Sequence, residues 1–77
     1  MLTDELILVT TPDQLGSLVR RQRKALKLTQ VEAAGLCGVG ERFLRELEKG
    51  KPTVELGRAL HVLAGLGIQL EARAGNT

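Results

Sequence analysis

Charged residues between positions 41 and 46 have the types and the spacing that could recognise the edges of nucleic-acid bases. A helix here would leave four charged side chains facing outward: Glu41, Arg42, Arg45 and Glu46. The guanidinium fork of Arg42 or Arg45 suits O6 and N7 of guanine, and Glu41 could accept a hydrogen bond from N4 of cytosine. Simpler explanations of these residues stay open. Arg42 could form an ion pair with Glu46 along the helix, and Glu41 could be present because the helix N-terminus favours a negative charge.

Positive charge gathers in two parts of the chain, although the net charge is only +2. Five of the eleven basic residues fall within positions 20–27. The second group consists of Arg42, Arg45, Lys49 and Lys51. Clustered cations raise the local potential that a polyanion feels. We expect Lys49 and Lys51 to contact phosphates, while a solvated helix face is the commoner role of a charge run taken alone.

The segment 29–49 has the pattern of a helix-turn-helix. Thr29 caps a short helix over about residues 30–37, a turn containing glycine follows, and a second helix spans about residues 41–49. The second helix is expected to be anchored by Val39, Leu44 and Leu47. In such a motif the second helix lies in the major groove and its first turns reach the bases.

Three more residues of this segment are candidate contacts. Thr29 and Gln30 open the first helix, where free backbone N–H groups and an amide could hold a phosphate. Phe43, the single aromatic residue, is expected to pack against the turn or to contact a thymine methyl or a sugar. Packing is the more common role of a lone aromatic side chain.

A helix is predicted on each side of this segment. Thr11 and Pro12 suit the start of a helix over about residues 12–26, and Thr53 suits the cap of a helix that ends near Gly65. The first helix should bury Leu15, Leu18, Val19 and Leu26. The last should bury Leu56, Ala59, Leu60, Leu63 and Leu66.

The two ends of the chain favour extended structure. Residues 6–10 form a short aliphatic and β-branched run, and residues 68–73 alternate apolar with polar side chains, which predicts a strand with one buried face. A lone strand leaves backbone groups unpaired. Pairing with a two-fold mate or with residues 6–10 would satisfy them, so a dimer and a monomeric hairpin are both possible.

The string TQVEAAGLCGVGERFLRELEKGKPT resembles the XRE class of regulators, which includes the lambda-type phage repressors. The matching positions are Thr29, Gln30, Ala34, Gly38, Val39, Glu48 and Gly50. The sub-pattern FLRELEKGKPT, with the later LGIQLEA, is similar to the HipB-type antitoxins, and the resemblance covers about residues 14–73. Ala33 replaces a usual leucine, and Gly40 replaces a usual serine or threonine, which removes a hydroxyl that could bind phosphate.

The resemblance implies roles that the residues alone do not establish. It implies that Gln30 clamps a phosphate, and that Arg23 and Glu48 form a structural salt bridge. It also implies that the C-terminal strands pair across a homodimer. The expected dimer interface consists of Leu63, Leu66, Ile68, Leu70 and Ala72. A HipA-like kinase toxin is the partner that such an antitoxin would hold inactive.

The composition argues against several other classes of protein. A chain of 77 residues suits one domain with little room for a water-excluding pocket, and a single cysteine, Cys37, makes no internal disulfide. His61 stands alone and is expected at the surface or an interface, with Cys37 as a small buried group. We therefore expect that the protein is not an enzyme and binds no metal, other cofactor or small-molecule substrate. We also expect a cytoplasmic protein without a membrane segment.

Together these patterns predict a mainly α DNA-binding domain of four or five helices with a short terminal β-strand. The resemblance implies that the domain is lambda-repressor-like and that the strand forms an intermolecular sheet. We expect one domain over 1–77. Its parts would be an extended segment at 1–10, helices within 12–66, a dimerisation strand at 67–73 and a tail at 74–77. The expected function is sequence-specific repression from palindromic operator DNA, as the antitoxin of a HipBA-like operon. The alternatives are a free-standing phage-type repressor and a toxin-neutralising module that binds DNA weakly.

Overall fold

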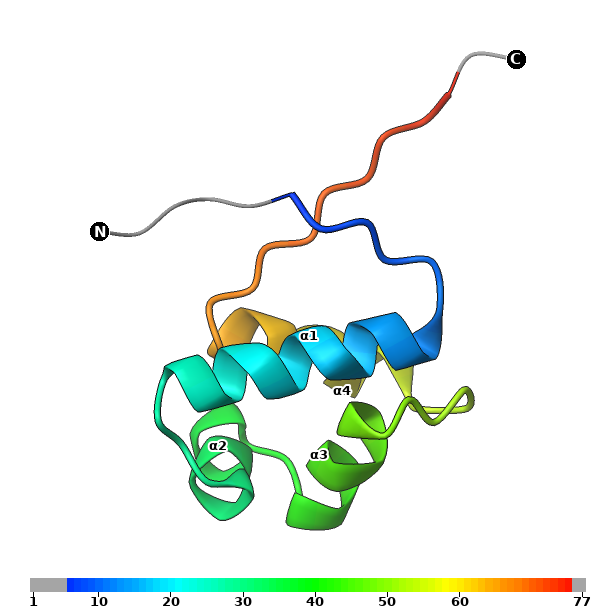
Figure 1. Cartoon of the computed structure of the whole chain (residues 1–77). Coiled ribbons are helices and arrows are strands. Elements are labelled where there is room, and N and C mark those ends of the chain that lie inside the picture. The colour runs from blue at the N-terminus through cyan, green and yellow to red at the C-terminus, as the bar shows by residue number, and fades with distance from the viewer. Residues whose placement is uncertain (1–5, 76–77) are drawn as a thin grey trace.

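The computed structural model describes residues 6–75, and within them the chain folds into four helices (Figure 1). They are α1 (Pro12–Ala25), α2 (Gln30–Cys37), α3 (Glu41–Glu48) and α4 (Leu56–Gly65). Helix α1 lies across the domain, with α2 and α3 below it and α4 behind it in Figure 1. The mainly helical prediction is therefore confirmed, and α1 to α3 begin and end within a residue of the predicted bounds.

Local capping explains where α1 begins. The hydroxyl of Thr11 accepts a hydrogen bond from the backbone N–H of Gln14 at 3.1 Å, and Pro12 occupies the first helical position. The side chain of Gln14 reaches back and accepts from the backbone N–H of Thr10 at 2.6 Å. These contacts satisfy N–H groups that have no partner inside the helix.

The start of α4 differs from the prediction. Glu55, rather than Thr53, is the N-cap, and its carboxylate accepts from the backbone N–H groups of Gly57 at 3.2 Å and Arg58 at 2.7 Å. A carboxylate has two acceptor oxygens and a full negative charge, both of which suit the positive end of a helix. The chain between α3 and α4 is correspondingly longer than predicted.

The core is aliphatic, as the sequence predicts, and every helix contributes to it. Its buried apolar members in the described part of the chain are Val19, Ala33, Ala34, Cys37, Leu44, Leu47, Ala59, Val62, Leu63 and Leu66. The thiol of Cys37 is buried against the carbonyl of Val62 at 3.7 Å, and this burial raises the pKa of Cys37. Gly16 allows α1 to meet α3 closely, because a Cβ there would lie 2.5 Å from the carbonyl oxygen of Leu47.

Three leucines predicted to be inward are instead exposed. Leu26 is 47% exposed, Leu56 66% and Leu60 43%. Leu26 is the C-cap residue of α1, after which the chain turns away through Lys27 at a φ of 60°. Helix α4 faces the core with a stripe that includes Val62, and Leu60 lies at the edge of this stripe.

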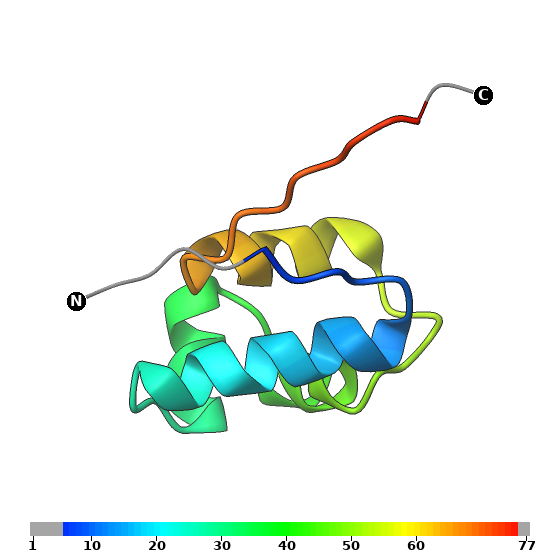
Figure 2. The same cartoon turned by 45° about the horizontal axis from the view of Figure 1, so that its top comes forward.

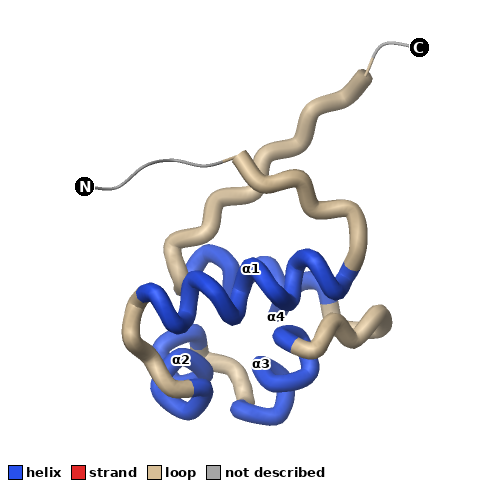
Figure 3. The backbone as a smooth tube through the Cα atoms, in the orientation of Figure 1, coloured by secondary structure: helices blue, strands red, loops and turns tan. Residues whose placement is uncertain are grey.

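The terminal segments contain no strand within residues 6–75, so the predicted strand at 68–73 is not formed in the single chain. The backbone N–H of Ile68 donates to the carbonyl of Leu63 at 2.8 Å, and the chain beyond it extends away from the helices (Figures 1 and 3). Residues 6–10 run as a loop above α1, and positions 1–5 of the predicted N-terminal segment lie outside the described residues. A strand needs a neighbour for its backbone groups, and neither segment has one here. None of the described helices is long and apolar enough to cross a membrane.

Candidate nucleic-acid interface

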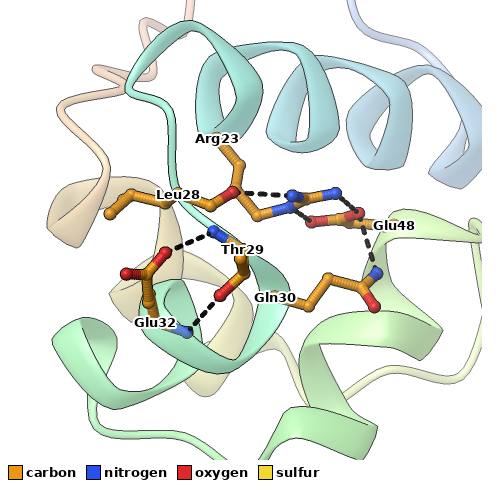
Figure 4. Close-up of polar contacts among 6 residues, drawn as sticks. All are labelled: Arg23, Leu28, Thr29, Gln30, Glu32 and Glu48. Atoms are coloured by element: carbon orange, nitrogen blue, oxygen red, sulfur yellow. Dashed lines mark hydrogen bonds and ion pairs between the residues drawn. The ribbon is translucent and has the colours of Figure 1, made fainter.

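Helix α2 begins with a complete capping box (Figure 4). The hydroxyl of Thr29 accepts from the backbone N–H of Glu32 at 3.1 Å, and the carboxylate of Glu32 accepts from the backbone N–H of Thr29 at 2.8 Å. This bond to the backbone lowers the pKa of Glu32. The box fixes the first turn of α2, which the sequence predicts to face a phosphate.

The turn between α2 and α3 depends on Gly38. This residue has a φ of 68°, a left-handed conformation that glycine adopts without steric cost. The backbone N–H of Val39 then donates to the carbonyl of Ala34 at 3.0 Å and closes the end of α2. The predicted glycine turn is confirmed, and it sets the direction in which α3 leaves.

Helix α3 has a buried face and a charged face, as predicted. Leu44 and Leu47 are 0% and 2% exposed and hold the helix against the core. On the other side, the side chain of Arg42 is 85% exposed and that of Arg45 is 45% exposed. The inward leucines therefore fix which side chains a groove of DNA would meet.

The charged face carries the ion pairs that the simpler explanation expects. Glu46 pairs with Arg42 at 3.6 Å and with Lys51 at 3.2 Å, and Glu41 pairs with Arg45 at 3.7 Å. The hydrogen bond from Lys51 is the main cause that lowers the pKa of Glu46. Exposed pairs of this kind contribute little to stability, so their arginines can exchange partners at small cost.

The N-terminus of α3 has no side-chain hydrogen bond from its N-cap residue. Gly40 is the N-cap, with an extended backbone and no capping hydrogen bond from a side chain. The first-turn N–H groups of α3 are therefore available to a bound group, although Gly40 supplies no hydroxyl of its own. Beyond the other end of α3, Lys49 is the exposed C-cap residue and Lys51 lies exposed in the following loop.

The predicted salt bridge between Arg23 and Glu48 is present and buried (Figure 4). Nε of Arg23 donates to Glu48 at 2.6 Å, Nη2 donates to the other carboxylate oxygen at 3.0 Å, and Nη1 donates to the carbonyl of Leu28 at 2.8 Å. The hydrogen bond to Glu48 raises the pKa of Arg23, which is 7% exposed. The pair joins α1 to the end of α3.

Gln30 belongs to the same network, which the sequence does not reveal. Its Nε2 donates to Glu48 at 3.1 Å, so the amide at the start of α2 is held by the carboxylate that binds Arg23. An amide nitrogen carries two hydrogens, and one remains for a phosphate. The network thus fixes the orientation of a side chain that the sequence assigns to phosphate contact.

Phe43 is partly buried against the core, which agrees with the packing role. The guanidinium of Arg58 lies over its ring at 6.0 Å from the centroid. Together they border a hollow of about 320 Å³ beside α3, lined by Arg42, Phe43, Glu46, Lys51, Thr53, Val54, Glu55 and Arg58. Arg58 is a cation that sequence reasoning missed, because it lies on α4 and meets Phe43 of α3 only in the folded chain.

The predicted dimer residues do not form one surface. Leu63 and Leu66 are 2% and 1% exposed inside the core of the protomer, so a partner could not contact their side chains without opening that core. Leu63 and Leu66 are therefore core residues of the protomer, and the dimer interface itself stays a prediction. Ile68 packs partly against the core, Leu70 is 50% exposed, and Ala72 is exposed on the extended segment.

Comparison with known proteins places this arrangement in a family. A family model described as helix-turn-helix matches residues 19–72. An uncharacterized HTH-type transcriptional regulator, y4mF of Sinorhizobium fredii, is 47% identical over 66 residues, which cover 86% of this chain and 87% of the relative.

Solved structures share the fold. A HipB variant in an O2 20mer complex superposes with a TM-score of 0.82 at 18% identity, over 94% of this chain and all of that one. HipB in an O4 20mer complex gives a TM-score of 0.81 at 18% identity, over 92% of this chain and 100% of the HipB chain.

The fold and the charged outward face of α3 define a helix-turn-helix regulator. The chain belongs to the helix-turn-helix family, in agreement with its resemblance to the XRE class of transcriptional regulators.

Proposed function

We propose that the protein is a sequence-specific DNA-binding repressor that reads its operator with α3. The observation that supports this most directly is the orientation of α3: its leucines are buried, while Arg42 and Arg45 point outward beside an uncapped N-terminus. A helix held in this way can enter a major groove, where an arginine fork on guanine discriminates by roughly 1–3 kcal/mol per base.

The neighbouring residues suit the sugar-phosphate backbone. Thr29 and Gln30 flank one side of α3, with Gln30 oriented by Glu48. Lys49 and Lys51 follow the C-terminal end of α3, the end at which Gln30 contacts Glu48, and carry charge that any phosphate attracts. Such contacts set the register of the protein on a duplex, while base contacts provide the specificity.

The protein would act as a homodimer on a palindromic site. One recognition helix contacts too few base pairs to be specific, and a two-fold dimer places two such helices about 34 Å apart. The unpaired C-terminal segment, with Ile68, Leu70 and Ala72, supports this proposal, because pairing with its mate would satisfy its backbone groups.

The finer assignment is that of an antitoxin in a HipBA-like operon, which would repress its own operon in the cytoplasm and hold a HipA-like kinase toxin inactive. Similarity to the HipB fold and the FLRELEKGKPT pattern support it. A free-standing repressor and a toxin-neutralising module with weak DNA binding are the alternatives. An adjacent kinase-like reading frame whose product co-purifies with this chain would favour the antitoxin over the free-standing repressor.

Fluorescence anisotropy with a duplex from directly upstream of the gene tests DNA recognition. The duplex is titrated against a scrambled duplex at several salt concentrations, with the wild type and an Arg42→Ala, Arg45→Ala variant. The matched control is Arg20→Ala, Lys24→Ala, which removes the same charge from the exposed part of α1.

Specific recognition predicts that the wild type prefers the native duplex by on the order of a thousandfold. The α3 variant should lose this preference and keep its salt dependence, and the α1 control should keep both. Equal and weak binding of the two duplexes by the wild type would contradict the repressor function. An α3 variant that still represses its operon would favour the protein-interaction module.

A further inference from the structure

We propose that residues 6–10, here called the N-terminal arm, form part of the contact with a second copy of this chain by pairing with its C-terminal segment, residues 68–73. This inference rests on the homodimer proposed above and specifies which surfaces meet. It assigns a role to a segment that lies outside the helix-turn-helix.

The arm has one covered side and one bare side. Leu6 and Leu8 are 77% and 84% exposed, whereas Ile7 between them is 40% exposed and Val9 is half-buried. Successive side chains of an extended segment point to opposite faces, so the side with Ile7 and Val9 is turned more toward the domain than the side with Leu6 and Leu8. Leu8 still borders, together with Ile7, a hollow beside α1. Two bare leucines side by side on extended backbone are the most exposed large apolar side chains in the described part of the chain.

The C-terminal segment has the complementary shape. Ile68 fixes its start through the hydrogen bond to Leu63 and by packing on the core, and Leu70 is then 50% exposed. No backbone hydrogen bond joins residues 69–73 to any other described residue. Its N–H and C=O groups are therefore open to a strand from another chain.

Both segments lie on the same side of the domain. Figure 1 shows the arm running above α1, and the C-terminal segment leaving the end of α4 and extending over the same side of the domain. Figure 2 shows both segments on this side in a second view. In Figure 1 this side is opposite α3. A contact made here would leave α3 of each copy free to reach a duplex.

The size of a stable interface argues that the arm is needed. Stable complexes bury about 800 Å² on each partner, with roughly 20–30 residues a side. Leu63 and Leu66 cannot contribute, because they are inside the core, and Ile68, Leu70 and Ala72 come from one short segment. The arm supplies the additional aliphatic surface next to that segment.

Within one chain, the backbone N–H and C=O groups of the arm and the C-terminal segment do not pair with each other. No hydrogen-bonded ladder joins the arm to the C-terminal segment, so the hairpin within one monomer is absent from residues 6–75. A second copy brings the same two segments, and two-fold symmetry then gives each arm a partner. The unpaired backbone groups of the arm in one protomer can then pair with those of the C-terminal segment in the other.

Sedimentation velocity over a range of protein concentrations tests the inference. The variant Leu6→Asp, Leu8→Asp places two charges on the bare side of the arm. The matched control is Val31→Asp, Leu36→Asp, because these side chains are also exposed, at 61% and 63%, but lie on α2. The arm variant should raise the Kd of the dimer by at least about tenfold, and the control should leave it unchanged.

A cross-link provides a second measurement that does not depend on weakened association. Differently tagged Leu8→Cys and Leu70→Cys chains are mixed and oxidised, with Cys37 buried in both. A disulfide between the two tagged chains is expected. A wild-type dimer that is neither weakened by the arm variant nor cross-linked would overturn the role of the arm and leave the dimer intact. A wild type that stays monomeric at every concentration would contradict the proposed homodimer itself.

Discussion

At the scale of single residues, Glu48 is the side chain on which most of the site depends. It accepts hydrogen bonds from Arg23 and Gln30, and so links α1, α2 and α3. Replacing Glu48 by Gln would leave the charge of Arg23 buried without its counterion. We expect the free energy of unfolding in urea to fall by about 3 kcal/mol, a large part of the stability of a small domain.

The double variant Arg23→Met, Glu48→Leu is the informative control. Replacing both partners with apolar groups removes the uncompensated charge, so this variant should regain most of the stability that Glu48→Gln loses. If Glu48→Gln costs less than about 1 kcal/mol, the pair is not the buried structural contact that its hydrogen bonds indicate.

At the scale of elements, the capping box of α2 makes stability depend on pH. The folded-state pKa of Glu32 is lowered, so its carboxylate stabilises the fold above the ordinary pKa of 4.5, and this contribution is lost as the pH falls through the lowered value. The variant Glu32→Gln keeps an acceptor but cannot titrate. Its Tm should lie below that of the wild type at pH 7, and the difference should shrink between about pH 5 and pH 3.

The control for this experiment is Glu71→Gln, which removes a carboxylate from the exposed C-terminal segment. Its Tm should follow that of the wild type throughout the titration. A gap between Glu32→Gln and the wild type that stays constant down to pH 3 would show that the charge of Glu32 does not act through the cap.

The start of α3 offers a stabilising change. Gly40 has φ and ψ of −72° and 151°, close to the −74° and 167° of the N-cap Thr29, and nothing lies within 4 Å of a Cβ built on it. Gly40→Ser should therefore add a cap and raise the free energy of unfolding by about 0.3 kcal/mol.

The variant Gly38→Ser should instead lower the free energy of unfolding by about 1 kcal/mol, because the backbone of Gly38 is left-handed. Urea denaturation of both variants measures the two changes in the free energy of unfolding, which should have opposite signs. If Gly40→Ser is no more stable than the wild type, the serine hydroxyl does not form a cap.

Those elements that depend on local chemistry could be predicted from the sequence, and those that depend on distant contacts could not. The bounds of α2 follow from Thr29 and Gly38, which act within a few residues. The start of α4 differs from the prediction because Thr53 is a residue type that usually caps helices, whereas the structure uses the carboxylate of Glu55, which is not a usual cap. The contact of Arg58 on α4 with Phe43 on α3 joins two separate helices, so no local pattern contains it.

The terminal strand shows a different limit. Apolar and polar residues alternate in the sequence of residues 68–73, but of the apolar side only Ile68 is packed, while Leu70 is 50% exposed. Alternation describes only the two faces of a segment. A strand also requires hydrogen-bonding neighbours in the plane of the sheet. One copy of the chain does not provide them, so whether the strand forms is a property of the assembly.

At the scale of the whole molecule, the two basic groups have different surroundings. Four of the five basic residues at 20–27 are exposed, on α1 or directly after it, whereas Arg23 is buried in its ion pair with Glu48. The opposite face of α1 packs on α3, which it approaches closely at Gly16. Lys49 and Lys51 instead follow α3 itself. If α3 lies in the groove, only the second group is close to phosphates, and the overall charge of +2 says little about binding.

The dependence of DNA affinity on salt distinguishes these two groups. Each phosphate contact contributes about 0.9 to the slope of the logarithm of affinity against the logarithm of salt concentration. Lys49→Ala, Lys51→Ala should therefore reduce the slope by about two for each bound protomer and weaken native and scrambled duplexes alike. The matched control, Arg20→Ala, Lys24→Ala, should leave the slope unchanged. The reverse result, with the slope reduced only by the α1 variant, would mean that the duplex lies along α1 and that α3 is not the reading helix.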